Sequence, residues 1–141
     1  MGRSPRRCVL LDSVATRLAD LAARARPQEC CGFLAGGIGP GGTIVQEVLP
    51  VRNDSALPDS FAICDAECYR AKHEARQHSL ELFAVYHSHP RHSAALSATD
   101  QQRLRWTGLD WVLVGREDEG WAIAVYAAQT ARRVTIMRTP R

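Results

Sequence analysis

Two spacings of hydrophobic residues alternate along the chain and predict an alternation of strands and helices. Apolar residues three or four positions apart predict helices over residues 13–25, 65–78 and 98–106. Short apolar or alternating runs predict strands at residues 8–11, 30–35, 43–51, 61–64, 81–89, 111–114, 121–127 and 134–137. This order is typical of an α/β or mixed α+β domain, in three layers or with a curved sheet.

Glycine, proline and small polar residues separate these elements. The glycines from Gly36 to Gly42 predict a hairpin-like turn between the second and third strands. Residues 53–60 combine Asn, Asp, Pro and Ser, which predicts a surface loop. Asp12 or Ser13 is expected to cap the first helix, because both side chains can accept hydrogen bonds from free helix amides.

The size and composition of the chain fit one compact domain. Its 141 residues are 45% hydrophobic, which is enough to fill one core. Much of the basic excess lies near the ends, so we expect a single domain over residues 1–141 with short basic tails at 1–7 and 138–141.

The charge balance argues against a nucleic-acid partner. The chain has 18 Lys and Arg against 15 Asp and Glu, a net charge of only +3. A nucleic-acid surface normally has a concentrated basic face with aromatic residues or a reading helix, and residues 12–130 show neither pattern. We therefore expect no nucleic acid among the partners.

The sequence also lacks the patterns of membrane and secreted proteins. It has no run of about 18 apolar residues and no signal-peptide segment, so we expect no membrane partner and a cytoplasmic location. Five cysteines are an odd number at low density, which favours reduced thiols. Whether any cysteines pair, and whether the chain oligomerises, stays open at this point.

The strongest chemical signal is the pair His87 and His89. Two residues separated by one position on a strand point to the same face, so both imidazoles can reach one ion. Asp100, in the first turn of the following helix, can return a carboxylate to them. Two histidines and one carboxylate suit Zn²⁺ with a fourth position open for catalysis.

Each part of this set also has a simpler interpretation. A His-x-His pair alone is often two half-exposed strand residues. Ser97 and Asp100 have the spacing of a capping box, which by itself only starts a helix. Glu29, just before an apolar strand, is by itself most simply a solvated carboxylate. If Glu29 faces the metal, however, it can take a proton from water and pass it to a leaving nitrogen.

Together, Glu29, His87-x-His89 and Ser97-x-x-Asp100 resemble the signature of the JAMM/MPN+ zinc metallopeptidases. The Pro90 that follows the second histidine adds to the match, which extends over most of the chain. Leu96 departs from the family pattern, where a proline often precedes the serine. Because position 96 is not a ligand, this difference bears on the stiffness of the loop rather than on metal binding.

The resemblance implies a fold, a metal and roles for five residues. Family members have a curved sheet flanked by helices, similar to the cytidine-deaminase fold. His87, His89 and Asp100 would be the zinc ligands and Glu29 the general base and acid. Ser97 would donate a hydrogen bond to the oxyanion, although its side chain could instead serve only as a helix cap.

The resemblance also implies a class of substrate. Family members cleave peptide or isopeptide bonds after the C-terminal Gly-Gly tail of ubiquitin or ubiquitin-like proteins. This short chain resembles the stand-alone prokaryotic branch, some of whose members act on ubiquitin-like sulfur-carrier proteins. We therefore expect a ubiquitin-like or sulfur-carrier partner; the particular substrate, the peptide or isopeptide preference and the pathway stay open.

Three other functions are compatible with parts of this pattern. A non-catalytic MPN-type module that only recognises a ubiquitin-like partner would keep the fold but has no need of an open zinc site. A DNA-repair-associated relative with a similar His-x-His-Pro signature usually has an N-terminal helical region, and only seven residues precede Cys8. A nucleoside deaminase would need a His-x-Glu and a Cys-x-x-Cys pair, which the sequence lacks.

Overall fold

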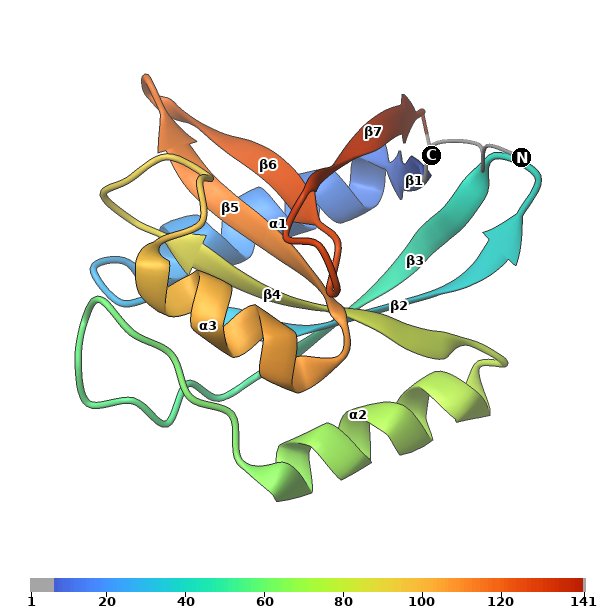
Figure 1. Ribbon diagram of the computed structural model, residues 1–141, viewed down its shortest axis with the longest axis horizontal. Helices are drawn as coiled ribbons and strands as arrows, with labels where there is room; N and C mark the ends of the chain where they lie inside the picture. Colours follow the sequence, from blue (N-terminus) through green and yellow to red (C-terminus); the bar gives the residue numbers. More distant parts are fainter. Residues whose placement is uncertain (1–6, 141) are drawn as a thin grey trace.

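The computed structural model describes residues 7–140, except for the side chains of residues 105–107. The described residues form three helices and seven strands (Figure 1). None of these helices has the length and apolar character needed to cross a bilayer. In chain order the elements are β1 (Arg7–Leu11), α1 (Asp12–Ala25), β2 (Cys31–Gly39), β3 (Gly42–Val51), α2 (Asp65–Gln77), β4 (Glu81–His89), α3 (Ala98–Thr107), β5 (Asp110–Glu117), β6 (Gly120–Tyr126) and β7 (Arg133–Thr139).

The strands form one mixed, closed sheet in the order β1-β3-β2-β4-β5-β6-β7. β4 lies in the middle of this order, antiparallel to β2 and parallel to β5. The sheet closes because β7 pairs in parallel with β1. β6 and β7 pair only between Val125 and Val134 and between Tyr126 and Arg133, so the rest of the two strands diverges (Figure 1). The predicted curved, mixed sheet with flanking helices is confirmed, whereas its closure was not predicted.

Helices cover both faces of the sheet and create two hydrophobic cores. On one face, Leu18 of α1 packs in a cluster with Tyr86 of β4. On the other face, Ala75 of α2 and Leu104 of α3 belong to a cluster that contains Val85. Neighbouring residues of β4 thus enter different cores, as strand geometry requires. Figure 1 shows α1 on one side of the sheet and α2 and α3 on the other.

The glycine-rich turn is shorter than the sequence predicts. β2 continues to Gly39 and β3 begins at Gly42, so only residues 40–41 make the turn. Gly36 therefore lies within a strand, where an added Cβ would collide with the carbonyl oxygen of Ile44. Its role is to allow close approach of two backbones at a register shift of the β2–β3 pair, rather than to reverse the chain.

The strand predicted at residues 61–64 is also wrong, because this segment is irregular. The N–H of Ala62 donates to Oδ1 of Asn53 at 3.0 Å, and the N–H of Asp54 donates to the Ala62 carbonyl at 2.9 Å. These bonds within the loop satisfy groups that a strand would offer to a neighbour. The segment therefore belongs to one long connection between β3 and α2.

The structure differs from the prediction in the cap of α1 and in the extent of the two terminal tails. Leu11, not Asp12 or Ser13, occupies the N-cap position of α1. The Asp12 carboxylate instead accepts from the Arg138 guanidinium at 2.7 Å. Arg7 and Arg138, which were expected in tails, lie in β1 and β7. β7 also contains Thr139, and Pro140 follows it. Residues 1–6 and 141, which complete the two expected tails, lie outside the described residues.

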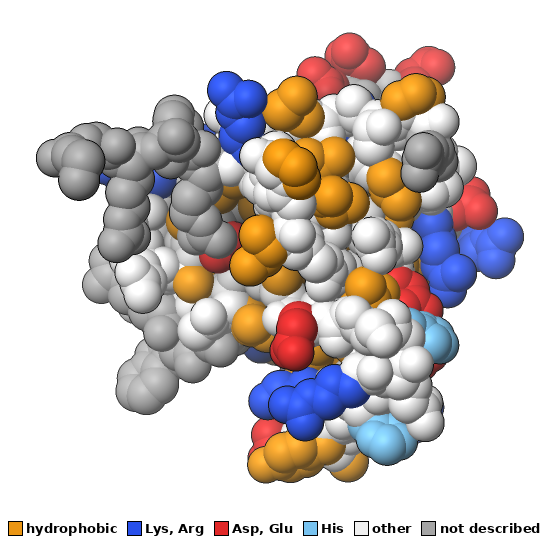
Figure 2. All heavy atoms as spheres, turned by 90° about the vertical axis from the view of Figure 1, so that its right-hand side faces the viewer, with side chains coloured by type: hydrophobic (Ala, Val, Ile, Leu, Met, Phe, Trp, Pro, Cys, Tyr) orange, Lys and Arg blue, Asp and Glu red, His pale blue; other side chains and the backbone are white. Residues whose placement is uncertain are grey.

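Among the described residues, charged side chains of both signs are mixed on the side of the molecule that Figure 2 shows. Lys and Arg side chains stand there in separate groups, with acidic and hydrophobic side chains between them. Among the described residues, the large hydrophobic side chains exposed to solvent are Ile38, Leu57, Tyr69 and Met137, which come from different segments of the chain. The described side chains therefore form no extended basic face on the side shown.

Candidate metal centre and catalytic pocket

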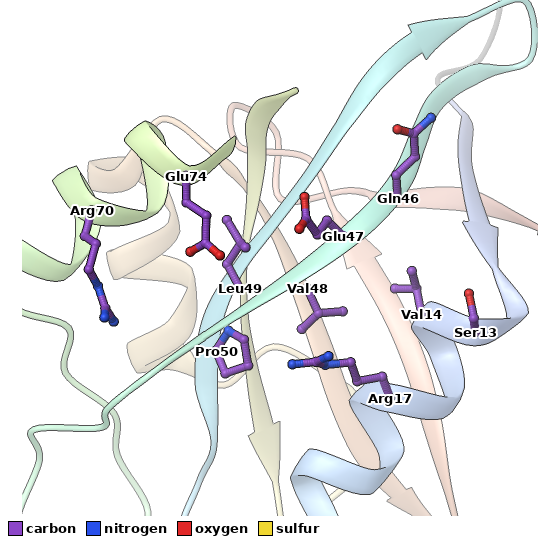
Figure 3. Close-up of a pocket in the computed structure, with 10 residues that line it drawn as sticks. All are labelled: Ser13, Val14, Arg17, Gln46, Glu47, Val48, Leu49, Pro50, Arg70 and Glu74. Atoms are coloured by element: carbon purple, nitrogen blue, oxygen red, sulfur yellow. The ribbon is translucent and has the colours of Figure 1, made fainter. Parts of the chain in front are cut away.

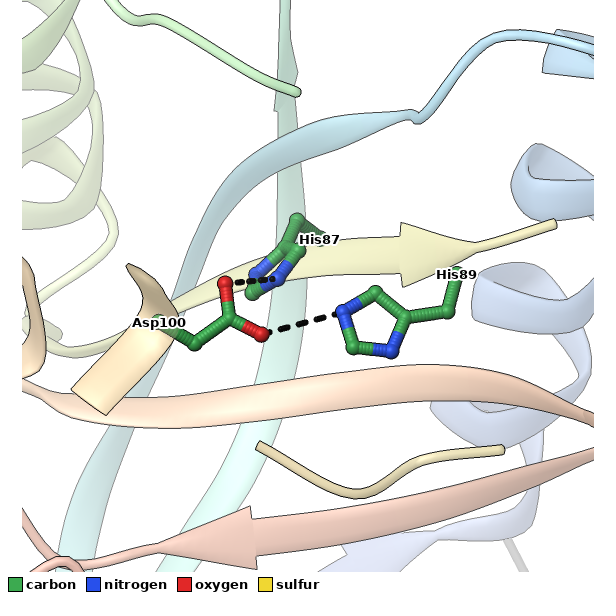
Figure 4. Close-up of side chains that lie close together, drawn as sticks. All are labelled: His87, His89 and Asp100. Carbon is green, nitrogen blue, oxygen red and sulfur yellow. Dashed lines mark hydrogen bonds and ion pairs between the residues drawn. The ribbon is translucent and has the colours of Figure 1, made fainter. Parts of the chain in front are cut away.

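The end of β4 and the first turn of α3 bring three potential metal ligands together (Figure 4). His87 and His89 are two positions apart on β4, so both rings point to the side of the sheet covered by α3. Nε2 of His87 lies 3.2 Å from Oδ1 of Asp100, and Nε2 of His89 lies 3.1 Å from Oδ2. One ligand atom from each residue falls within 4.8 Å of the others.

A capping box fixes the carboxylate of this group. The Ser97 N–H donates to Oδ2 of Asp100 at 3.1 Å, and the Asp100 N–H donates to Oγ of Ser97 at 3.0 Å. The cap is therefore present, and it orients Asp100 toward the two histidines. Because Oγ of Ser97 only accepts in this pair, its O–H remains available as a donor. Ser97 is exposed and lines the pocket described below.

The hydrogen bonds of His89 leave one ring nitrogen for an ion. Nδ1 of His89 lies 2.9 Å from the Ser93 carbonyl, which can only accept, so Nδ1 carries a proton. In the neutral ring Nε2 then presents a lone pair to the Asp100 carboxylate. A lone pair facing a carboxylate oxygen at 3.1 Å is favourable only with a proton or a cation between them. A backbone carbonyl on the distal nitrogen is the usual partner of a metal-binding histidine.

His87 provides a second indication that this group of side chains can bind a cation. Its ring is fully buried, and neither ring nitrogen has a hydrogen-bond partner among the described residues. Buried polar atoms of this kind normally have a partner, so an orphaned imidazole whose Nε2 points to a carboxylate fits a metal ligand. Phe61 stacks on the ring with centroids 4.3 Å apart and holds its plane.

Electrostatics favour the metal-binding protonation states of His87 and Asp100. Burial lowers the pKa of His87 to about 4, so the imidazole is neutral. Burial acts to raise the pKa of Asp100, but the two neighbouring histidines and the Ser97 N–H outweigh it and hold that pKa well below its usual range. A neutral imidazole and an ionised carboxylate are the forms that coordinate a cation. Two nitrogen ligands and one oxygen ligand therefore fit Zn²⁺ with one position open.

Glu29 lies in the same pocket, just before β2. The side chain is 7% exposed, so it is not the solvated carboxylate that its place in the sequence first indicates. Burial raises the pKa of Glu29 to about 7, while the neighbouring His89 and Arg103 side chains act to lower it. A carboxyl group with a pKa near 7 can both accept and release a proton near neutral pH.

The pocket that contains these groups has a volume of about 640 Å³. It lies between the connection that follows β3, the end of β4 and the start of α3. Its lining residues are Glu29, Leu57, Asp59, Ser60, Phe61, His89, Pro90, Arg91, His92, Ser93, Ala95, Ser97, Thr99, Asp100 and Arg103. The structure thus brings Glu29, His87, His89, Ser97 and Asp100 together, as the sequence predicts, although their roles in catalysis remain a proposal.

Sequence reasoning missed three residues that shape this site. Asn53 binds the backbone of Glu29, Phe61 stacks on His87, and Arg103 lies over Phe61 with Cζ 4.1 Å from the ring centroid. Only Arg103 had a signal in the sequence, because it lies three residues after Asp100 and so shares its side of α3. Asn53 and Phe61 act through contacts across the fold that no local pattern shows.

A second hollow, of about 440 Å³, lies apart from this pocket. Figure 3 shows it over β3, with Arg17 of α1 on one side and Arg70 and Glu74 of α2 on the other. It has no lining residue in common with the pocket that contains Glu29 and Asp100, and no histidine or cysteine lines it. Glu47, which lines this second hollow, is therefore a suitable control position.

Solved structures with the same arrangement of strands and helices define the fold. The solution structure of protein DSY2949 from Desulfitobacterium hafniense has a TM-score of 0.81 at 22% identity, with 95% of this chain and 94% of that chain covered. A structure described as "JAMM: a metalloprotease-like zinc site in the proteasome and signalosome" has a TM-score of 0.56 at 15% identity, covering 96% and 99% of the two chains. The fold is that of a JAMM/MPN domain.

A family model described as prokaryotic homologs of the JAB domain matches residues 11–137. The chain belongs to this family, which confirms the resemblance seen in its sequence. A desampylase of Haloferax volcanii is 29% identical over 103 residues, which are 72% of this chain and 73% of the relative.

Proposed function

We propose that this protein is a zinc-dependent peptidase that hydrolyses the peptide or isopeptide bond after the C-terminal Gly-Gly tail of a ubiquitin-like or sulfur-carrier protein. Membership of the JAB-domain family and the similarity to a desampylase support the class of substrate. The alternative is an MPN-type module that binds such a partner without cleaving it.

One observation carries the proposal more than any other. His87, His89 and Asp100 present ligand atoms within 4.8 Å of one another, beside a buried carboxylate that lines the same pocket. A module that only binds a partner has no use for a buried base next to an incomplete ligand set. A hydrolase needs both, because water must be activated where the substrate carbonyl is held.

Each residue of the proposed site has a different role in the hydrolysis. His87, His89 and Asp100 would hold Zn²⁺. Bound zinc supplies Lewis acidity, which polarises the scissile carbonyl and makes water more acidic. Glu29 accepts a proton from the attacking water as the C–O bond forms, and returns it to the leaving nitrogen as the C–N bond breaks. The O–H of Ser97, which its cap leaves free, donates to the oxyanion.

The test separates metal binding from catalysis. Elemental analysis should find about one zinc per chain in the wild type and in Glu29→Gln, and none in His89→Ala. Hydrolysis of a ubiquitin-like carrier joined through Gly-Gly to an amide reporter should fall about 10² to 10⁴-fold in Glu29→Gln. Glu47→Gln, in the second hollow, is the matched control and should stay active.

Two outcomes would contradict the proposal. A fully active Glu29→Gln protein would exclude Glu29 as the base. Metal-free protein that still binds the carrier as tightly as the wild type, with no hydrolysis under any metal supply, would favour the binding module instead.

A further inference from the structure

Arg103 is a cation in the catalytic pocket that has no role in the proposed hydrolysis. It lies on α3 one turn after Asp100 and lines the pocket together with Glu29 and Ser97. Within residues 7–140, excluding the side chains of 105–107, no carboxylate lies within ion-pair distance of its guanidinium. A half-buried guanidinium without an anionic partner gives up part of its hydration without the usual compensation.

The position of this guanidinium is fixed by aromatic side chains. Cζ of Arg103 lies 4.1 Å from the Phe61 ring centroid and 5.9 Å from that of Trp111. Phe61 in turn stacks on His87, so the cation is held in layers against one of the proposed ligands. Stacking orients the planar face of an arginine and leaves its N–H edge free for a bidentate acceptor.

We propose that Arg103 binds the free α-carboxylate of a single amino acid on the leaving side of the scissile bond. This inference rests on the proposed function and narrows its substrate class. The site would then prefer a Gly-Gly tail extended by one α-linked residue over a tail joined to a lysine side chain.

Covalent geometry explains why a nearby cation can make this distinction. In an α-linked terminal residue the carboxylate carbon is only two bonds from the leaving nitrogen. Glu29 protonates that nitrogen, and Glu29 and Arg103 line the same pocket. In an isopeptide the leaving nitrogen is the ε-amine of a lysine, and four methylene groups separate it from a backbone that has no free carboxylate there. A guanidinium beside the reaction centre therefore has an acceptor only in the first case.

Other charges in the pocket are less suited to this role. Arg91 and His92 also line it, but both are exposed on the loop after β4, and neither stacks on an aromatic ring among the described residues. Asp59 lines it as well, but it is exposed and makes no ion pair within the described part of the chain. Arg91 is therefore a suitable control, since it has the same charge in the same pocket without the stack.

The test measures binding without turnover. Zinc-loaded Glu29→Gln protein is titrated with a ubiquitin-like carrier that ends in Gly-Gly-Ala, as the free acid or as the terminal amide. The acid should bind about tenfold more tightly than the amide, as expected for a charge-assisted pair. Each further substitution is made in the Glu29→Gln protein. Arg103→Gln should remove the preference for the acid, Arg103→Lys should retain part of the preference, and Arg91→Gln should retain all of it. Zinc content and melting temperature verify that each variant is folded.

Equal binding of acid and amide by the protein with Arg103 intact would overturn the inference, as would loss of the preference in Arg91→Gln alone. Hydrolysis by the protein with Glu29 intact is measured separately, on the Gly-Gly-Ala carrier and on an isopeptide-linked lysine. Cleavage of both without preference overturns only the inference about Arg103. If Glu29→Gln binds the acid selectively but the protein with Glu29 intact cleaves neither substrate, the carboxylate subsite is supported and the proposed function is contradicted.

Discussion

Nδ2 of Asn53 donates to the backbone carbonyl of Glu29 at 3.0 Å, and so ties the proposed base to the connection after β3. The same amide group donates to the Ser60 carbonyl at 3.0 Å. Its Oδ1 accepts from the N–H groups of Ser55 and Ala62 at 2.9 and 3.0 Å. One side chain therefore holds both Glu29 and the segment that presents Phe61 to His87.

Replacing Asn53 should damage both stability and catalysis. In Asn53→Ala several part-buried backbone groups lose their partners, which should lower the free energy of unfolding by about 1 to 3 kcal/mol. The position of Glu29 would relax, so kcat on a Gly-Gly substrate should fall more than zinc affinity. Chemical denaturation, kcat and zinc content measure the three effects. Ser55→Ala, which removes one exposed hydrogen bond, is the control and should stay within about 0.5 kcal/mol. Unchanged kcat in a folded Asn53→Ala protein would contradict this role.

Zinc should stabilise the folded protein. Because the ligands are brought together only in the folded state, zinc at about 100 times its Kd should add about 2.7 kcal/mol to the free energy of unfolding. For a chain of this size the melting temperature should rise by several degrees. Differential scanning calorimetry of chelator-treated protein, with and without added zinc, measures the shift. His89→Ala should show no shift, and an equal shift in that variant would place the zinc elsewhere.

Two substitutions of Ser97 separate the helix cap from the proposed oxyanion donor. Glycine is a tolerated N-cap residue, so Ser97→Gly should cost only a few tenths of a kcal/mol in stability. It lacks the hydroxyl, however, and kcat should fall about 10² to 10³-fold. Ser97→Thr keeps both functions and should retain most activity. If Ser97→Gly is as active as Ser97→Thr, the hydroxyl serves only as a cap.

Glu29 should make the metal-free protein less stable as the pH rises. Its pKa is raised by burial from 4.5 to about 7, so the folded state favours the protonated acid. The associated stability is present below about pH 4.5 and is lost as the pH rises through about 7. Metal-free Glu29→Gln should therefore be more stable than the wild type by about 1 to 3 kcal/mol at pH 8, with a smaller difference at pH 5. Urea denaturation at the two pH values measures the effect. The exposed Glu74→Gln is the control, and a difference that does not grow with pH would argue against a buried Glu29.

Local signals in the sequence were sufficient to predict most elements and the close approach of His87, His89 and Asp100. Residues 81–89 form the central strand with the predicted bounds, and this periodicity alone places His87 and His89 on one face. The spacing from Ser97 to Asp100 predicts the capping box that the structure contains. Both features depend on a few neighbouring residues, whose geometry the backbone dictates.

Features that depend on distant contacts were not predictable in this way. Residues 61–64 have the apolar character of a strand, but their backbone groups bind Asn53 and Asp54 across the loop. Asp12 looks like a helix cap, but its carboxylate pairs with Arg138, 126 positions away in the sequence. The burial of Glu29 likewise depends on elements that meet only in the folded chain.

Because one carboxylate both completes the capping box and faces the two histidines, the start of α3 and the ion site share a structural element. An ion held by Asp100 and the two histidines would restrain the same carboxylate that accepts from the Ser97 N–H. The first turn of α3 should then open less often in the zinc-bound protein, and amide hydrogen exchange at Ser97 and Asp100 should be slower when zinc is bound. The local stability of the first turn of α3 would thus depend on whether zinc is bound.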